Sequence, residues 1–127
     1  MKVCIIPIGA RGQYEVVVDA EDYPYLTQWR WTYKRSRGGK IYARRHRRID
    51  GRRETVLMHN VVLTECMGLE RPTEHHTGDH RDRNSLDNRR GNLRWATKSE
   101  QGVNRRFVRL PRRELLTVCN DADSMPF

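Results

Sequence analysis

The sequence predicts a small α+β protein in which an antiparallel β-sheet comes first and short helices follow. Between residues 28 and 58, apolar and polar side chains alternate, as they do in strands that bury one face. The pairs Gly38-Gly39 and Asp50-Gly51 interrupt this stretch, and such pairs favour tight hairpin turns. With 127 residues, the chain is long enough for one compact domain.

Two β-rich segments open the chain. Residues 3–8, VCIIPI, and 13–19, QYEVVVD, predict two short strands joined by a glycine-containing turn. A helical turn over residues 20–26 would follow, with Asp19 as its N-terminal cap.

The alternating stretch predicts a three-stranded antiparallel meander with one aromatic face. Trp29, Trp31 and Tyr33 lie on that face, which we expect to supply most of the small core. His59–Gly68 then predicts a short helix that glycine closes. Residues 107–127 show no pattern and are expected to form a loose tail.

The charge of the chain predicts a polyanionic partner. The formal net charge is +9 and the pI is near 10.1, which favours DNA or RNA over an anionic membrane. No apolar run approaches the roughly 20 residues that span a bilayer. Three cysteines without a Cys-x-x-Cys pair favour a reducing compartment. We therefore expect a cytoplasmic protein without a membrane partner.

Basic residues crowd the predicted strands and hairpin tips, where only Asp50 opposes them. A charge run often covers nothing more than a solvated face, yet an excess of arginine on a β-ribbon is also how strands grip phosphates. The expected DNA contacts are Arg35, Arg37, Lys40, Arg44, Arg45, Arg47, Arg48, Arg52, Arg53, Arg89, Arg90 and Arg94.

The stretch HHTGDHRDRNSLDNRRGNLRWAT, residues 75–97, has the residue types of a phosphodiester-cleaving site. Asp79 suits a hard divalent cation, and His80, with an ordinary pKa of ~6.5, suits proton transfer near neutral pH. If the chain doubles back, Asn92 would add a neutral oxygen ligand and leave positions for water and phosphate oxygens. Asn88 would accept a hydrogen bond from the imidazole and fix its tautomer.

Simpler interpretations compete with this one. The Asp79-His80 pair alone fits a surface turn, and Asn84 fits a turn residue better than a ligand. A zinc site built from Cys66, His76 and His80 is less favoured because the chain has no paired-cysteine knuckle.

The segment GDHRDRNSLDNRRGNLRWAT, residues 78–97, resembles the HNH motif of phage- and intron-encoded homing endonucleases, in the variant that ends in asparagine. The segments VVVDAEDYPYLTQWRWTY, IYARRH and LMHNVVL are similar to what precedes the motif in that family. The resemblance therefore covers roughly residues 3–106.

This resemblance implies a metal-dependent DNA endonuclease that hydrolyses phosphodiester bonds and leaves a 5′ phosphate. Asp79 and Asn92 would hold one divalent metal, His80 would be the general base, and Asn88 would orient His80. Asparagine at the last position favours Mg²⁺, with Mn²⁺ as the alternative. Gln101 departs from the family, whose members commonly have asparagine there.

The resemblance also implies how the chain is divided. Residues 1–58 would form the sheet that contacts DNA, 59–106 the ββα-metal finger, and 107–127 the tail. The partner would be double-stranded DNA, a homodimer could cut both strands, and a phage-encoded chain would act in the bacterial cytoplasm. The rivals are a non-catalytic DNA-binding protein, such as a repressor or a decayed endonuclease, and an RNA-binding protein.

Overall fold

The computed structural model describes residues 2–107 and 117–118, and its first sheet is built by the two ends of this range. Strand β1 (Lys2–Ile8) pairs antiparallel with β2 (Tyr14–Asp19), with Val3 opposite Asp19 at one end and Ile8 opposite Tyr14 at the other. A short strand β8 (Thr117–Val118) pairs in parallel with the other edge of β1.

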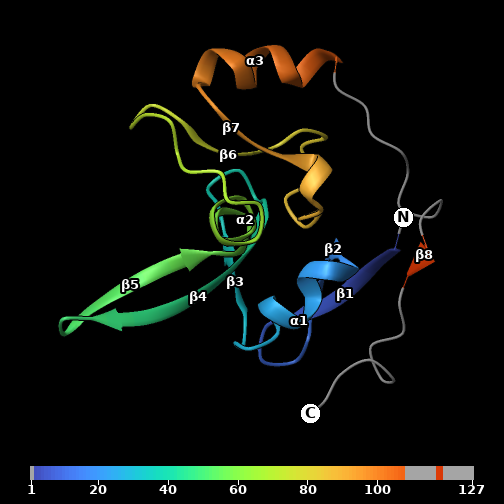
Figure 1. The fold of residues 1–127 in the computed structure, drawn as a ribbon, viewed down its shortest axis with the longest axis vertical. Coiled ribbons are helices and arrows are strands. Elements are labelled where there is room, and N and C mark those ends of the chain that lie inside the picture. Colours follow the sequence, from blue (N-terminus) through green and yellow to red (C-terminus); the bar gives the residue numbers. More distant parts are fainter. Residues whose placement is uncertain (1, 108–116, 119–127) are drawn as a thin grey trace.

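The second sheet is the predicted meander, with the order β3-β4-β5. Its strands are β3 (Thr32–Arg35), β4 (Ile41–Ile49) and β5 (Arg52–Leu57). The predicted turn at Asp50-Gly51 is confirmed, because both residues have the positive φ angles (51° and 78°) that a type I′ turn requires. Figure 1 shows the β4–β5 hairpin reaching away from the rest of the molecule.

Short helices connect the sheets to the C-terminal part of the fold. The turn η1 (Ala20–Asp22) and helix α1 (Tyr23–Leu26) follow β2. Helix α2 (Met58–Val61) continues into the π-helical η2 (Val62–Cys66), and Gly68 follows with a φ of 71°, as predicted.

The last part has the order strand, strand, helix. Strand β6 (Thr77–His80) pairs antiparallel with β7 (Leu93–Ala96), and the turn η3 (Arg90–Asn92) leads into β7. Helix α3 (Lys98–Phe107) follows β7. These small antiparallel sheets and short helices confirm the α+β class.

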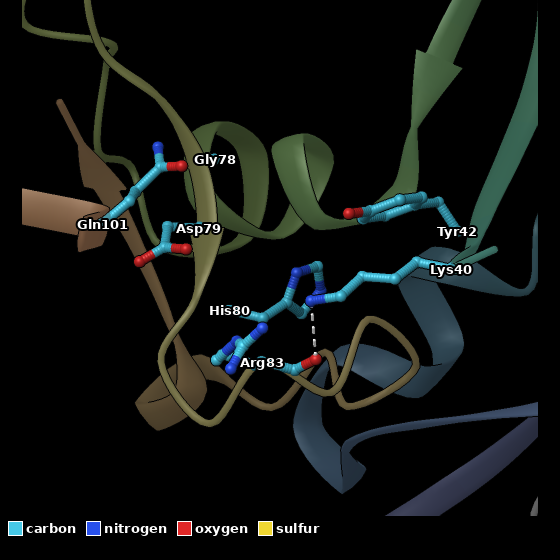
Figure 2. Close-up of a pocket in the computed structure, with 7 residues that line it drawn as sticks. All are labelled: Lys40, Tyr42, Gly78, Asp79, His80, Arg83 and Gln101. Carbon is cyan, nitrogen blue, oxygen red and sulfur yellow. Dashed lines mark hydrogen bonds between the residues drawn. The ribbon is translucent and has the colours of Figure 1, made fainter. Parts of the chain in front are cut away.

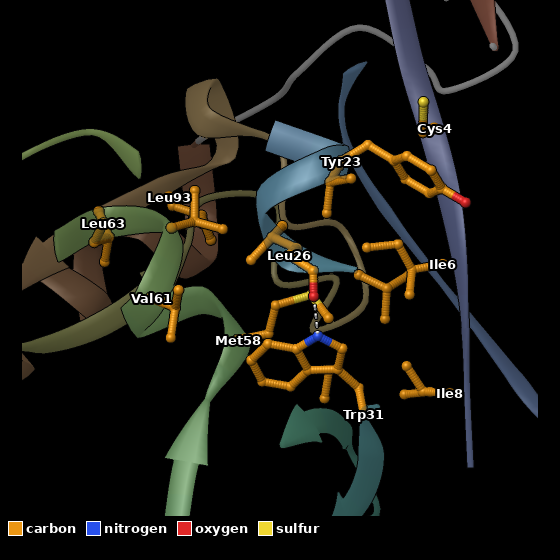
Figure 3. Close-up of a cluster of buried hydrophobic side chains, with 14 of the residues drawn as sticks. Cys4, Ile6, Ile8, Tyr23, Leu26, Trp31, Met58, Val61, Leu63 and Leu93 are labelled. Atoms are coloured by element: carbon orange, nitrogen blue, oxygen red, sulfur yellow. Dashed lines mark hydrogen bonds between the residues drawn. The ribbon is translucent and has the colours of Figure 1, made fainter. Parts of the chain in front are cut away.

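The core lies between β1, α1, α2 and β7, as Figure 3 shows. Aliphatic side chains dominate it, among them Ile6, Ile8, Leu26 and Leu63, all buried. The expectation that the aromatic face of the meander supplies most of the core is wrong, because aliphatic side chains from β1, β2, α2 and η2 make up more of it, and Trp29 and Tyr33 are only partly buried against it. Trp31 is buried and donates its indole N–H to the Leu26 carbonyl over 2.7 Å.

Other local predictions also need correction. Gly38-Gly39 is not a two-residue turn: β3 ends at Arg35 and β4 begins at Ile41, and a Ser36 N–H to Lys40 carbonyl bond of 2.8 Å closes the longer loop.

Asp19 does not cap the following helical turn with its side chain. Its Oδ2 accepts from the Arg90 N–H over 2.9 Å instead, so Asp19 anchors η3 to the end of β2.

The two described cysteines differ in their redox state. Cys66 is a free thiol, but Cys4 is disulfide-bonded, so the expectation of reduced cysteines does not hold for Cys4.

The predicted loose tail over 107–127 lies outside the described residues except for Phe107 in α3 and for β8. Among the described helices, none is long and apolar enough to cross a membrane.

Candidate active site

The long loop between β6 and β7 is docked on the edge of β2. The Val17 N–H donates to the Leu86 carbonyl over 2.9 Å, and the Asn88 N–H donates to the Val17 carbonyl over 2.7 Å. These bonds form a parallel bridge between Val17 and Asp87. Because a paired strand edge is rigid, the loop places the Asn88 side chain at a fixed position beneath β6.

His80, at the end of β6, is held by Asn88. Its Nε2 lies 2.7 Å from the Asn88 Oδ1, and both side chains are buried. An amide oxygen can only accept, so Nε2 carries the proton and Nδ1 keeps a lone pair. Burial lowers the pKa of His80, while the Asn88 bond and the charge of Asp79 raise it by less. The imidazole is therefore neutral at pH 7, as a proton acceptor must be.

Two rings flank His80. The His59 ring from α2 lies 4.8 Å from it, centroid to centroid, and the Tyr42 ring from β4 lies 6.0 Å away. Burial, followed by the charge of His80, lowers the pKa of His59 to about 3, so the His59 ring is neutral near pH 7. Its Nδ1 is buried and has no hydrogen-bond partner among the described residues.

Gly78 lets α2 come this close to β6. A Cβ at this position would lie 2.5 Å from the His59 Cδ2 and 2.5 Å from the Asn60 Oδ1. Real Cβ atoms do not approach other atoms so closely, so any larger residue would push α2 and β6 apart. The glycine next to Asp79 therefore sets the spacing between the two histidines.

A pocket of about 280 Å³ opens beside His80. Its lining residues are Lys40, Tyr42, Gly78, Asp79, His80, Arg83 and Gln101. Figure 2 shows Asp79 and Gln101 on one side of His80 and Lys40 and Tyr42 on the other. The Lys40 Nζ donates to the Arg83 carbonyl over 3.1 Å, which ties β4 to the turn after β6.

Oxygen atoms in the pocket suit a hard cation. Asp79 is mostly buried, and one of its carboxylate oxygens lies 3.1 Å from the Arg94 Nε. The Gln101 amide nitrogen donates to the Thr77 Oγ1 and the Ala96 carbonyl, over 2.7 and 3.1 Å, which leaves its oxygen for a ligand. No group of three histidine, cysteine, aspartate or glutamate residues lies close enough to hold a metal in the described part of the chain.

Asn92 lies in the loop and not in the pocket wall. It is fully buried, its Oδ1 accepts from the Asp82 N–H over 3.0 Å, and its Nδ2 donates to the Asp82 Oδ1 and the Asp87 carbonyl. The amide thus closes the turn that follows β6. Of the four predicted catalytic and metal-binding residues, the structure brings His80 and Asn88 into contact and puts Asp79 beside them.

Several predicted DNA contacts are used inside the protein. The side chain of Arg89 is only 6% exposed and forms a two-bond ion pair with Asp87, which contradicts its predicted role at the surface. Arg90 is paired with Asp22 in the same way. On the hairpin, Arg45 lies 4.2 Å above the Trp29 ring.

Besides Gly78, three pocket residues were absent from the predicted site. Tyr42 was identifiable from strand alternation, because its neighbours Ile41 and Ala43 are apolar. Gln101 stands at a position where the resembling family commonly has asparagine, which was a signal of function. Arg83 has a positive φ of 66° in a turn, and nothing in the sequence marked it.

Comparison with known proteins identifies the segment that builds most of this pocket. Residues 56–103 match the family model described as HNH endonuclease, and this range includes α2, β6, the loop and β7. No curated protein and no solved structure gives a significant match. Residues 56–103 therefore have the sequence of an HNH endonuclease domain.

Proposed function

We propose that the protein is a metal-dependent DNA endonuclease in which His80 is the general base. One observation carries this proposal: the His80 imidazole, fixed by Asn88 over 2.7 Å, faces a pocket that also contains Asp79 and the cations Lys40 and Arg83. A base, an acidic oxygen ligand and positive charge around one cavity are what hydrolysis of a phosphodiester requires.

The residues of this chain can carry out the proton and charge steps. The His80 Nδ1 would take a proton from a water molecule, whose oxygen attacks phosphorus while the bond to the 3′ oxygen breaks. Asn88 would keep the proton of the neutral ring on Nε2. The side chains of Lys40 and Arg83 line the pocket where the negative charge of the phosphate grows.

The pocket fits a divalent cation that prefers oxygen ligands. Asp79 supplies a carboxylate, and water and phosphate oxygens can complete the six positions that Mg²⁺ takes. When bound, such a cation supplies Lewis-acid stabilisation of the leaving oxygen. We propose Mg²⁺ as the cofactor and Mn²⁺ as its substitute.

The second protein ligand is Asn92 or Gln101. Asn92 follows the family resemblance, but its buried amide already has three partners in the loop. Gln101 lines the same pocket as Asp79, so its amide oxygen is the better placed of the two. We therefore favour Asp79 and Gln101 as ligands, with Asn92 as the brace of the loop.

A plasmid-nicking assay tests the proposed activity. Supercoiled DNA is incubated with Mg²⁺, Mn²⁺ or EDTA and with wild type, His80→Ala or His75→Ala, an exposed histidine of the connector as control. We expect metal-dependent nicks that His80→Ala loses by about 10² to 10⁴-fold, while DNA binding persists. Cutting that survives His80→Ala would disprove the assignment of the base. Binding without cutting in any metal would favour a non-catalytic DNA-binding protein.

The choice of ligand is tested by Mn²⁺ binding followed by electron paramagnetic resonance. We expect Asp79→Asn and Gln101→Ala to weaken Mn²⁺ binding without lowering stability by much. Asn92→Ala should instead lower the free energy of unfolding by about 1–3 kcal/mol, because it leaves buried groups unpaired. If Asn92→Ala weakens Mn²⁺ binding in the folded protein and Gln101→Ala does not, then Asn92, the ligand that the family resemblance implies, binds the metal.

The products report the oligomeric state. A monomer with one site would convert supercoiled plasmid to the nicked circle, whereas a homodimer would also give the linear form early in the reaction. Light scattering on the free protein and on its DNA complex provides the matching mass.

A further inference from the structure

We propose that the DNA backbone lies along one face of the β4–β5 hairpin, continuing directly from the catalytic pocket. We call it the even face, because it carries the even-numbered side chains of β4, Arg44, His46 and Arg48, with Arg53 and Thr55 opposite them on β5. This inference rests on the proposed function and adds to it the path of the substrate.

The two faces of β4 are fixed by what its side chains touch. Ile41 and Ala43 are buried in the core, and Arg45 lies over the Trp29 ring, so the odd-numbered side chains point toward the body of the protein. Tyr42 lines the catalytic pocket on the opposite face. Since side chains alternate along a strand, the residues that follow Tyr42 in steps of two continue its face.

Charge separates the two faces further. On the odd face, Arg47 stands opposite Glu54 and forms an ion pair with it over 3.2 Å. On the even face, Arg48 stands directly opposite Arg53, and no acidic residue of either strand shares that face.

The cross-strand neighbours confirm which side chains share the even face. His46 stands opposite Thr55, and their side chains lie 3.4 Å apart. Like charges that face each other across a strand pair are destabilising unless an anion lies between them. The pair Arg48 and Arg53 is therefore suited to a phosphate.

The even face leads into the pocket without a break. Lys40, which directly precedes β4, and Tyr42 line the pocket, and Arg44, His46 and Arg48 follow Tyr42 on β4. The six residue-to-residue steps from Tyr42 to Arg48 span about 20 Å, which is the axial length of about six base pairs. A duplex cut in the pocket would therefore reach the hairpin turn within roughly half a helical turn.

The test compares two charge-matched double variants. Arg48→Gln with Arg53→Gln removes two cations from the even face, and Arg47→Gln with Arg52→Gln removes two from the odd face at the neighbouring positions. All four side chains are exposed, one from each strand in each pair. Binding to a labelled duplex is measured by fluorescence anisotropy in EDTA over a series of KCl concentrations, which separates binding from cutting.

We expect the even-face variant to bind on the order of tenfold more weakly and the slope of log Kd against log salt to fall by about 2. The odd-face variant should change both quantities far less. Restoring the charge with Arg48→Lys and Arg53→Lys should restore the slope. Equal losses in both variants, or a larger loss for the odd face, would overturn the proposal, because net charge or the other face would then explain binding.

Substrate length gives a second readout. Duplexes are shortened on either side of a mapped cut. Shortening below about six base pairs on one side should weaken binding by wild type and leave the even-face variant unchanged.

If wild type cuts DNA but both double variants bind alike, this inference fails and the nuclease stands. If no protein cuts DNA but only the even-face variant loses binding, the nuclease fails and the binding face stands.

Discussion

The hairpin β4–β5 and the loop between β6 and β7 are both rich in arginine, yet they use it in opposite ways. In the loop, Arg89 is buried with Asp87, and Arg90 is bound to Asp22. On the hairpin, Arg48 faces Arg53 across the strands without an acidic neighbour on that face.

This difference shows that the position of the acids, and not the number of arginines, decides which cations can bind a ligand. Asp87 of the loop and Asp22 of η1 neutralise the loop arginines, and Asp87 and Asp19 also accept backbone N–H groups of the segment that follows Asn88. On the hairpin, Arg48, Arg52 and Arg53 are exposed to solvent or to a partner. The loop arginines therefore help to hold the site in place, and the exposed hairpin arginines are the ones left able to bind an anion.

Breaking the loop pair should have the largest effect on stability. Asp87→Asn leaves the buried Arg89 guanidinium without its counter-charge, and we expect the free energy of unfolding to fall by about 3–5 kcal/mol. Glu54→Gln on the hairpin breaks an exposed pair whose side chains are about half accessible, so it should cost less than about 1 kcal/mol. Urea denaturation of both variants measures the contrast.

DNA binding by the Glu54→Gln variant gives a second measurement on the hairpin. Glu54→Gln adds positive charge to the hairpin and should leave DNA binding unchanged or slightly stronger. Similar stability losses in the two variants would show that the Asp87–Arg89 pair is not the support that the geometry indicates.

The fold was predictable where alternation and turn chemistry agree. The strands β1 and β2, the meander, the Asp50-Gly51 turn and the end of η2 before Gly68 follow from local pattern. The source of the core was not predictable in this way. Aromatic residues draw attention by size, but the small aliphatic side chains of β1 and β2 meet α1 and α2 only through the tertiary fold.

Part of the site was predictable for the same reason. Asp79, His80 and Asn88 are short-range neighbours in sequence, and their types match their chemistry. Asn92 and Gln101 are both amides near the motif, and only the fold shows that the first closes a loop while the second lines the pocket. Whether an arginine is buried, as Arg89 is, depends on partners that sequence spacing does not specify.

Adding a methyl group should cost more at a glycine in tight contact inside the site than at a glycine in an open loop. Gly78→Ala would place its methyl group 2.5 Å from His59 and Asn60, and we expect a loss of about 1–3 kcal/mol together with slower cutting. Gly38→Ala, in the loop before β4, meets no atom within 4 Å and should change neither quantity by much. Thermal unfolding and the nicking rate are measured on both variants. If the two behave alike, α2 and β6 are not held at the spacing described.

The buried His59 and the hairpin His46 should differ in how they affect stability against pH. The pKa of His59 is about 3 in the folded protein because of burial, and ~6.5 in the unfolded chain. Below pH 6.5 the unfolded state therefore binds a proton that the folded state does not, so His59 makes the free energy of unfolding fall as pH falls.

The expected slope from His59 is about 1.4 kcal/mol per pH unit between pH 6 and the folded pKa, and stability is regained as pH rises through ~6.5. His59→Asn should remove this contribution, so that its unfolding free energy falls less steeply than that of wild type in urea titrations at successive pH values. His46 is on the exposed hairpin, where solvent and salt screen its neighbours Arg44 and Arg53. His46→Asn should therefore leave the slope almost as in wild type. Equal slopes in wild type and His59→Asn would mean that His59 is charged or reached by water in the folded protein, and the neutral ring beside His80 would have to be abandoned.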